Sequence, residues 1–185
     1  MTRRLPVGAA LGLYAALFGA AVLWRTVLYG EPLLFADGAA ARAGLHPFRD
    51  AALGAACAVA AAGASGLSES YTDWGRRLAA ELSDLVGPLS RVECLALALA
   101  SGIAEEAFFR GALQPRVGLV GASVLFGLAH LPATRGLRAW TALALASGFG
   151  LGFLFEATGS LVAPATAHVG VNAVGLWSLA RKAKR

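Results

Sequence analysis

Six long apolar segments constrain this sequence more than any other feature. They consist mainly of Ala, Leu, Val, Gly and Phe, and they span approximately residues 5–28, 48–66, 90–113, 117–131, 137–156 and 160–180. A helix needs about 20 apolar residues to cross a bilayer. Because an unpaired backbone group is costly in lipid, such segments cross as helices. The pattern therefore predicts an all-α polytopic membrane protein with about six transmembrane helices.

The composition and the placement of charge agree with a membrane protein. Hydrophobic residues make up 57% of the chain and charged residues 15%, with a mean hydropathy of +0.64, whereas soluble domains are about 45–50% apolar and about 25% charged. The net charge of +5 comes from basic residues that flank the apolar segments and gather in 181–185. We therefore expect a bilayer and no nucleic acid as partner, and a single integral-membrane domain over residues 1–185.

The order of the segments also predicts an orientation in the cell membrane. Residues 5–28 form a longer run than the apolar core of a signal peptide, so we interpret them as an uncleaved first span. Six spans place both termini on one side of a multi-pass protein. Most of the arginines and lysines fall on that side, among them Arg3, Arg4, Arg135 and Arg185. The positive-inside rule then makes both termini cytoplasmic.

A segment of different character, residues 67–86, separates the second apolar run from the third. Its larger apolar side chains recur at steps of three or four, which predicts one face of a helix; they are Leu67, Tyr71, Trp74, Leu78, Leu82 and Leu85. Charged residues occupy the opposite face. Such a helix suits the membrane interface, where it would be either an anchoring connector or a lid that guides substrate.

Two kinds of small residue indicate packing rather than chemistry. Cys57 and Cys94 lie in apolar surroundings without metal or redox spacing, so we expect both to be buried as small hydrophobic residues. The pairs Gly8/Gly12 and Gly148/Gly152 have the spacing that lets neighbouring helices approach closely.

Polar residues within the apolar segments are the strongest indication of function. An ionisable group inside a bilayer costs about 2.5–3.5 kcal/mol on insertion scales. This chain places six polar residues in three segments, namely Glu105, Glu106, Arg110, His130, His168 and Asn172. At ~1.5 Å per residue, counted from turns near Pro115 and Gly159, four of them fall near the middle of a ~30 Å core, namely Glu105, His130, His168 and Asn172. Three helices therefore bring polar groups to a similar depth.

The spacing within the third segment divides its charges. Glu106 and Arg110 are four residues apart, so they share a helix face and can pair. Glu105 is rotated from Glu106 by about 100° and can face elsewhere. We therefore expect Glu106 and Arg110 to be structural and Glu105 to face a polar cavity.

The other two segments supply partners for Glu105. His168 and Asn172 share one face of the last segment, and Phe126 and His130 share one face of the fourth, where the aromatic ring forms a wall.

These residue types are suited to water activation. A carboxylate in a low-dielectric site can be a general base, a histidine can relay the proton, and a second histidine with an amide can donate hydrogen bonds to an oxyanion. Alternatively, Glu105, His130 and His168 would hold a zinc ion with one position open for water. A structural ion-pair cluster and a proton relay are the remaining readings of these residues.

Three motifs occur in order on separate apolar segments: "EEAFFR" (105–110), "FGLAH" (126–130) and "HVGVN" (168–172). Together they resemble the Glu-Glu-x-x-x-Arg, Phe-x-x-x-His and His-x-x-x-Asn motifs of the CAAX-protease and bacteriocin-processing family (CPBP, also Abi). The resemblance covers about residues 90–180, which would form the catalytic core. It implies an intramembrane endopeptidase acting on a membrane-associated protein or peptide.

By the same resemblance, Glu105 would activate water with help from His130. His168 and Asn172 would stabilise the oxyanion, and Glu106, Arg110 and Phe126 would support them. The family has been described both as metal-dependent and as a glutamate-type protease. Since the chain has no His-Glu-x-x-His motif, we expect no metal and no other cofactor, with zinc as the alternative.

Six spans are fewer than the eight typical of CAAX proteases that process prenylated proteins. The resemblance therefore points to peptide maturation or C-terminal sorting of surface proteins. The alternative is a non-catalytic membrane protein that keeps the fold, either an immunity-type binder or a proton-coupled transporter.

Overall fold

The computed structural model describes residues 5–132 and 137–184, and these residues form a helical bundle. The elements in chain order are α1 (Val7–Val22), η1 (Leu23–Leu28), α2 (Gly38–Ala43), α3 (Pro47–Tyr71), α4 (Asp73–Val86), α5 (Arg91–Glu106), η2 (Ala107–Leu113), α6 (Gln114–Ala129), α7 (Arg138–Thr158) and α8 (Val162–Lys182), where η marks a π-helix. An isolated bridge between Phe35 and Ser160 is the only β pairing in the described ranges. The all-α class is confirmed. Arg3, Arg4, Arg135 and Arg185, which enter the predicted orientation, lie outside the described residues.

The helix boundaries follow local signals in the sequence. Ser90 caps α5 in a capping box with Glu93, which satisfies two donors at the helix start. The chain turns at Gly118, with a φ of +74° inside α6, and not near Pro115. Proline is tolerated in the first turn of a helix, whereas a positive φ favours glycine. The turn between the third and fourth segments therefore lies a few residues later than expected.

The prediction of one amphipathic helix over residues 67–86 is wrong. Leu67 and Tyr71 belong to the end of α3, and Thr72 interrupts the helix in an extended conformation. The Thr72 side chain accepts a hydrogen bond from the backbone N–H of Gly75, which makes it the N-cap of a new helix, α4. Within α4, Leu78 is buried and Trp74 is 47% exposed. Exposed apolar side chains on a charged helix fit a membrane interface.

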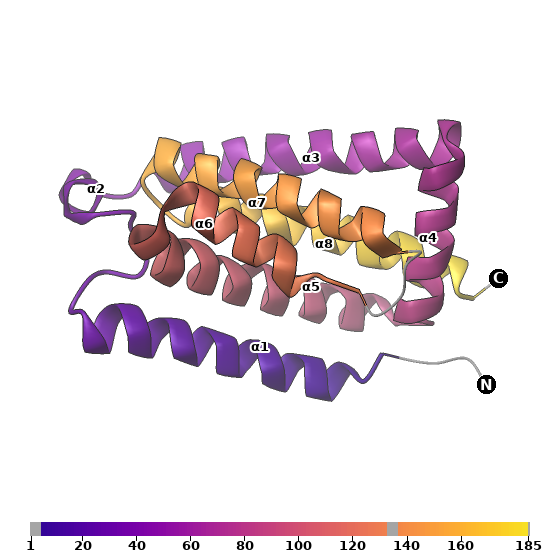
Figure 1. Cartoon of the computed structure of the whole chain (residues 1–185), viewed down its shortest axis with the longest axis horizontal. Helices are drawn as coiled ribbons and strands as arrows, with labels where there is room; N and C mark the ends of the chain where they lie inside the picture. Colours follow the sequence, from indigo (N-terminus) through magenta and orange to yellow (C-terminus); the bar gives the residue numbers. More distant parts are fainter. Residues whose placement is uncertain (1–4, 133–136, 185) are drawn as a thin grey trace.

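The long helices run lengthwise, and α4 lies across one end of the bundle (Figure 1). Helix α8 packs against both α3 and α5, while α6 packs on α7 and α1 on α5. The backbone N–H of Leu5 donates to the Val86 carbonyl at 3.3 Å, and Ser83 Oγ donates to the Leu179 carbonyl at 3.0 Å. The start of α1, the helix α4 and the end of α8 therefore meet at the same end of the bundle.

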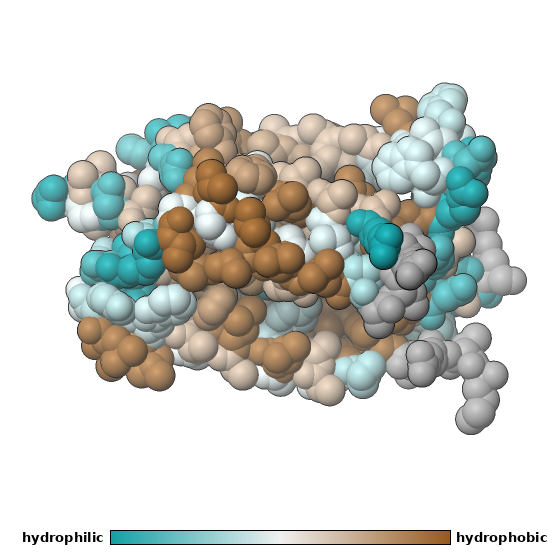
Figure 2. Space-filling view, viewed as in Figure 1, coloured by the Kyte–Doolittle hydropathy of each residue, from teal (hydrophilic) through white to brown (hydrophobic). Residues whose placement is uncertain are grey.

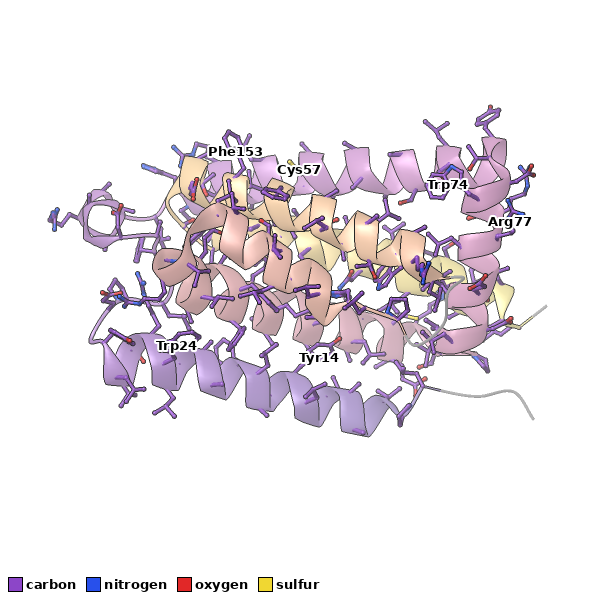
Figure 3. The ribbon with its side chains drawn as sticks, viewed as in Figure 1. Tyr14, Trp24, Cys57, Trp74, Arg77 and Phe153 are labelled. Atoms are coloured by element: carbon purple, nitrogen blue, oxygen red, sulfur yellow. The ribbon has the colours of Figure 1, made fainter. Side chains whose placement is uncertain are left out.

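On the face that Figure 2 shows, apolar residues cover much of the middle, and most of the hydrophilic residues lie toward the two ends. Within residues 5–132 and 137–184, three helices are long and apolar enough to cross a membrane: Val7–Leu28, Pro47–Tyr71 and Arg138–Thr158. Large apolar side chains such as Val59, which is 74% exposed, and Phe153 point outward from these helices, as Figure 3 shows for Phe153. These features fit a membrane protein, while the count of six spans and the cytoplasmic position of the termini stay predictions.

Two glycines of α7, Gly148 and Gly152, allow this helix to pack closely against α6. A Cβ atom on Gly152 would lie 2.5 Å from Leu119 Cδ1, and one on Gly148 would lie 3.1 Å from the Ser123 backbone. The close approach predicted for this pair is confirmed. No such contact exists for Gly8 and Gly12, because nothing described lies within 4 Å of a Cβ at either position.

Cys94 is buried as predicted, but the prediction for Cys57 is wrong. Helix α3 buries Asp50, Gly54 and Ala58 along one face. Cys57, which Figure 3 labels on α3, precedes Ala58 and does not belong to this buried face. It is exposed because only one face of α3 is covered by other helices.

Candidate active site

The charged residues of "EEAFFR" lie where α5 continues into the π-helix η2. Glu105 and Glu106 are the last residues of α5, and Arg110 lies within η2. All three side chains are buried, with Glu106 at 0% and Arg110 at 1% exposure. π-Helical turns are rare and often occur at functional sites. Nothing in the residue spacing predicted this change of helix type.

Glu106 is held by two donors. Arg110 Nη1 and His168 Nδ1 each lie 2.7 Å from Glu106 Oε1. Arg110 also donates through Nη2 to the Gly148 carbonyl at 3.1 Å. The expected contact between Glu106 and Arg110 is present, and His168 is an additional partner that the spacing within one helix did not indicate.

Glu105 faces both histidines. Its Oε2 atom lies 3.7 Å from His130 Nε2 and 3.9 Å from His168 Nε2. The same oxygen is buried and has no hydrogen-bond partner in the described part of the chain. The bundle therefore brings together three of the predicted residues, from α5, α8 and the end of α6, at distances slightly too long for direct hydrogen bonds.

In each histidine, the hydrogen bond made by Nδ1 determines whether Nε2 faces Glu105 as a donor or as an acceptor. His130 Nδ1 lies 2.8 Å from the Phe126 carbonyl, which can only accept, so Nδ1 carries the hydrogen. His168 Nδ1 meets the Glu106 oxygen that also accepts from Arg110 Nη1, so it also donates. In the neutral rings, both Nε2 atoms are therefore acceptors. Three acceptors face one another at the site.

Aromatic contacts hold the two imidazoles in place. The Phe126 ring centroid lies 4.6 Å from that of His130 and 5.9 Å from that of His168. The Arg110 guanidinium lies 4.4 Å from the same ring centroid. Trp140 of α7 approaches His130 from another side, with ring centroids 6.0 Å apart. Phe126 is thus the wall that its spacing to His130 predicted.

Asn172 lies one helical turn after His168 in α8, and its Nδ2 donates to Ser101 Oγ at 2.9 Å. Ser101 is four residues before Glu105 in α5, so the two share a face of that helix. This bond occupies one of the two amide hydrogens of Asn172 and leaves the second for another acceptor.

Sequence reasoning missed Ser101 and Tyr14. Tyr14 belongs to α1, and its side chain interacts with those of Glu105 and Ser101. Figure 3 shows it pointing from α1 toward the rest of the bundle. Both residues are single hydroxyl groups in otherwise apolar runs, which is the signal that would have found them. Helix α1 thus contributes to the site although the motifs lie only in residues 105–172.

The same residues do not match the geometry of a zinc site. A zinc ion needs ligand atoms at about 2.0–2.2 Å in a tetrahedral arrangement. Across residues 5–132 and 137–184, no group of three or more His, Cys, Asp and Glu side chains has such an arrangement. Glu105, His130 and His168 therefore do not form a ready ligand set.

Comparisons with known proteins agree with the motifs. Residues 88–174, which hold every predicted site residue, match the family "Type II CAAX prenyl endopeptidase Rce1-like". The chain is also similar to the uncharacterized protein YpbD of Bacillus subtilis (strain 168), with 41% identity over 80 residues. That match covers 42% of this chain and 41% of YpbD, so the chain spans less than half of that relative. No solved structure matches the chain. The match over residues 88–174 is therefore consistent with the resemblance of the motifs to the CAAX-protease and bacteriocin-processing family.

Proposed function

We propose that this protein is an intramembrane endopeptidase that hydrolyses a peptide bond in a membrane-associated protein or peptide. One observation carries the proposal: a buried carboxylate oxygen of Glu105 faces the Nε2 atoms of His130 and His168 at 3.7 and 3.9 Å. Polar atoms that are too far apart for a direct hydrogen bond can be joined through a water molecule. Because all three atoms are acceptors, a bridging water would donate both its hydrogens, which is how a general base activates it.

The reaction follows from this arrangement. Glu105 takes one proton from the water while the water oxygen attacks the carbonyl carbon of the scissile bond. As the tetrahedral intermediate collapses, the carbon–nitrogen bond breaks, and His130 assists transfer of the proton to the leaving nitrogen. The water oxygen ends in the new carboxyl group, and the leaving amine carries the proton. The bond between His130 Nδ1 and the Phe126 carbonyl keeps the ring aimed at Glu105.

The remaining residues support the developing oxyanion. The second N–H of Asn172 is one donor, and His168 becomes another when its Nε2 is protonated. Glu106 positions His168 through the 2.7 Å contact to Nδ1. Arg110 in turn holds Glu106, so both are positioning residues rather than catalytic ones.

Substitution of the base tests the mechanism. We expect Glu105→Gln, Glu105→Ala and His130→Ala each to abolish cleavage while the protein still inserts into the membrane. Cleavage is measured with purified enzyme in lipid vesicles, and insertion by protease accessibility of the loops. Full activity of Glu105→Gln would remove Glu105 from the role of base and favour the non-catalytic alternatives.

Metal dependence is tested separately. We expect activity to survive exhaustive chelation and elemental analysis to find no stoichiometric metal in active protein. If activity is lost and zinc alone restores it, Glu105, His130 and His168 are ligands rather than base and donors.

The substrate is identified by comparing membrane proteomes. We propose a role in peptide maturation or in C-terminal sorting of surface proteins. A deletion strain carrying Glu105→Ala should accumulate precursors that retain a terminal segment, whereas the same strain carrying the wild-type gene should not. Identical proteomes in the two strains would argue for a binding or transport role.

A further inference from the structure

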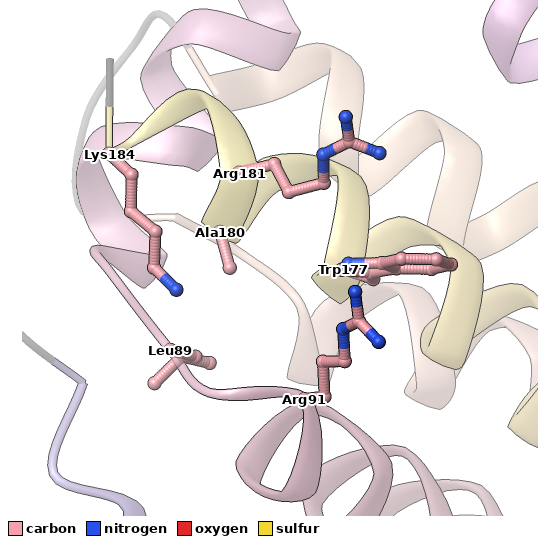
Figure 4. Close-up of a pocket in the computed structure, with 6 residues that line it drawn as sticks. All are labelled: Leu89, Arg91, Trp177, Ala180, Arg181 and Lys184. Atoms are coloured by element: carbon pink, nitrogen blue, oxygen red, sulfur yellow. The ribbon is translucent and has the colours of Figure 1, made fainter.

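A second polar site lies at the end of the bundle that carries α4, away from the acidic centre. A pocket of about 360 Å³ is lined by Leu89, Arg91, Trp177, Ala180, Arg181 and Lys184. Figure 4 shows three cationic side chains gathered around it, from the start of α5 and the end of α8. Its buried floor is formed by Leu89 and Ala180.

Among the residues that the structure describes, no acidic side chain neutralises the cations of this pocket. No described carboxylate pairs with Arg91, Arg181 or Lys184. The neighbouring Lys182, by contrast, pairs with Glu69. Glu93 is the acidic residue of the adjacent turn, and its side chain accepts the backbone N–H of Ser90. Three unpaired cations around one pocket favour an anionic ligand.

The two arginines are held in a fixed geometry. Their guanidinium carbons lie 5.6 Å (Arg91) and 5.8 Å (Arg181) from the centre of the Trp177 ring, and Figure 4 shows the ring lying between the two groups. Cation–π contacts of this kind orient guanidinium groups without using their hydrogen-bond donors. Those donors are then available for phosphate oxygens, which arginine binds well.

The surroundings show that such a ligand would come from the bilayer. Trp177 is 45% exposed, and tryptophan is enriched at headgroup level. Leu95 is one turn beyond Arg91, and Val174 is one turn before Trp177; both are exposed. They continue the faces of α5 and α8 from the pocket toward the apolar middle of the bundle, where acyl chains would lie.

We propose that this pocket binds the phosphate headgroup of an anionic phospholipid in the leaflet that contacts the α4 end. Arg91, Arg181 and Lys184 contact the phosphate, and Trp177 lies at the boundary between headgroup and chains. This binding is independent of the proposed hydrolysis, because none of these residues contacts Glu105, His130 or His168.

The test is native mass spectrometry of the full chain released from nanodiscs. The discs contain phosphatidylcholine with a minor share of phosphatidylglycerol. We expect the wild-type protein to retain phosphatidylglycerol selectively, and the double variant Arg91→Gln/Arg181→Gln to retain about 30-fold less, since each basic residue near an anionic surface contributes about a fivefold gain in affinity.

The matched control is Arg76→Gln/Arg77→Gln in α4. It removes the same charge at the same end of the bundle, and we expect it to retain the lipid nearly as well as wild type. Equal loss in both double variants would overturn the proposal in favour of general surface attraction, as would equal retention in all three proteins. Circular dichroism and the thermal midpoint check that Arg91→Gln/Arg181→Gln is folded.

A second arm separates the lipid from a soluble anion. Inorganic phosphate is added to the protein in discs of phosphatidylcholine alone. We expect no phosphate to stay bound and no change in thermal midpoint. A wild-type-specific rise in the midpoint with phosphate, lost in Arg91→Gln/Arg181→Gln, would replace the lipid by a free anion.

Discussion

Two ionic clusters in this bundle, one partly exposed near α2 and one buried at the candidate active site, have opposite balances of donors and acceptors. Near α2, Glu31 Oε2 is shared by Arg25 at 2.7 Å and Arg116 at 2.6 Å. Arg25 also donates to the Ala36 carbonyl, and Arg116 lies 3.8 Å from the Tyr29 ring centroid. This cluster is rich in donors, and it ties η1, the following loop and the start of α6 together.

The candidate active site is instead rich in acceptors. Glu105 Oε2 meets two imidazole nitrogens, neither within direct hydrogen-bond distance. In the α2 cluster Arg25 Nη1 and Nη2 have acceptors while Nε has none among the residues described, and an unsatisfied buried polar atom costs about 1–3 kcal/mol. A site that must bind and deprotonate water needs acceptors that the protein leaves unsaturated. The balance of donors and acceptors thus separates the two clusters better than charge alone.

The largest difference in cleavage rate should come from the same substitution, Glu to Gln, made once in each cluster. Glu105→Gln removes the proposed base and should lower the cleavage rate by about 10²–10⁴-fold. Glu31→Gln should leave the rate within about twofold, because it touches no reacting group. Rates in identical vesicles measure this; equal losses in the two variants would erase the distinction between the clusters.

The next effect concerns stability at Glu106. Glu106→Leu leaves the buried Arg110 without its carboxylate, and breaking a buried pair in this way costs about 3–5 kcal/mol. Glu106→Gln keeps an acceptor for Arg110 and His168, so it should cost less. We expect Glu106→Gln to lower protein yield more than specific activity, measured by expression level and by rate per folded molecule. If Glu106→Gln lowered specific activity more than yield, Glu106 would be the base and Glu105 the structural residue.

A smaller loss is expected at the α2 end. Arg25→Met removes a buried guanidinium from Glu31 and from two backbone carbonyls and should cost about 1–3 kcal/mol in free energy of unfolding. Activity per folded molecule should not change. Thermal unfolding in lipid discs measures the first quantity, and a selective loss of rate without loss of stability would show that this cluster takes part in catalysis.

The smallest effect is expected at Ser101. Ser101→Ala deletes the acceptor that holds Asn172, which typically contributes about 0.5–1.5 kcal/mol. The rate should fall about 2–10-fold, with stability nearly unchanged. Ser101→Thr, which keeps the hydroxyl, should restore most of the rate. If Ser101→Ala cleaves as fast as wild type, Asn172 does not need this bond for its orientation.

The sequence predicted the parts of the fold that depend on local pattern. Apolar segments gave the long helices, and the four-residue spacing of Glu106 and Arg110 placed them in contact. The break at Thr72 was missed because the apolar period continues across it, and only the N-cap chemistry of threonine marks the new helix. Cys57 was misplaced because an apolar helix with one packed face looks the same in sequence as a buried one.

The candidate site was predictable only as a set of residues. The motifs and the estimated depth identified Glu105, His130, His168 and Asn172 as candidates. They did not predict which of these side chains would be in contact. Contacts between His168 and Glu106 and between Asn172 and Ser101 join residues 62 and 71 positions apart. Such contacts depend on the packing of α8 against α5. The π-helical turn η2 has no sequence pattern of its own that would have predicted it.

The central claim is that Glu105 activates a water molecule and does not itself attack the substrate. It is tested most directly by a single turnover in water enriched in oxygen-18, followed by mass spectrometry of the product and of the enzyme peptide that contains Glu105. We predict one oxygen-18 atom in the new carboxyl group of the product and none in Glu105. An unlabelled product together with label in Glu105 would contradict the account, because the carboxylate would then have formed the bond to the substrate.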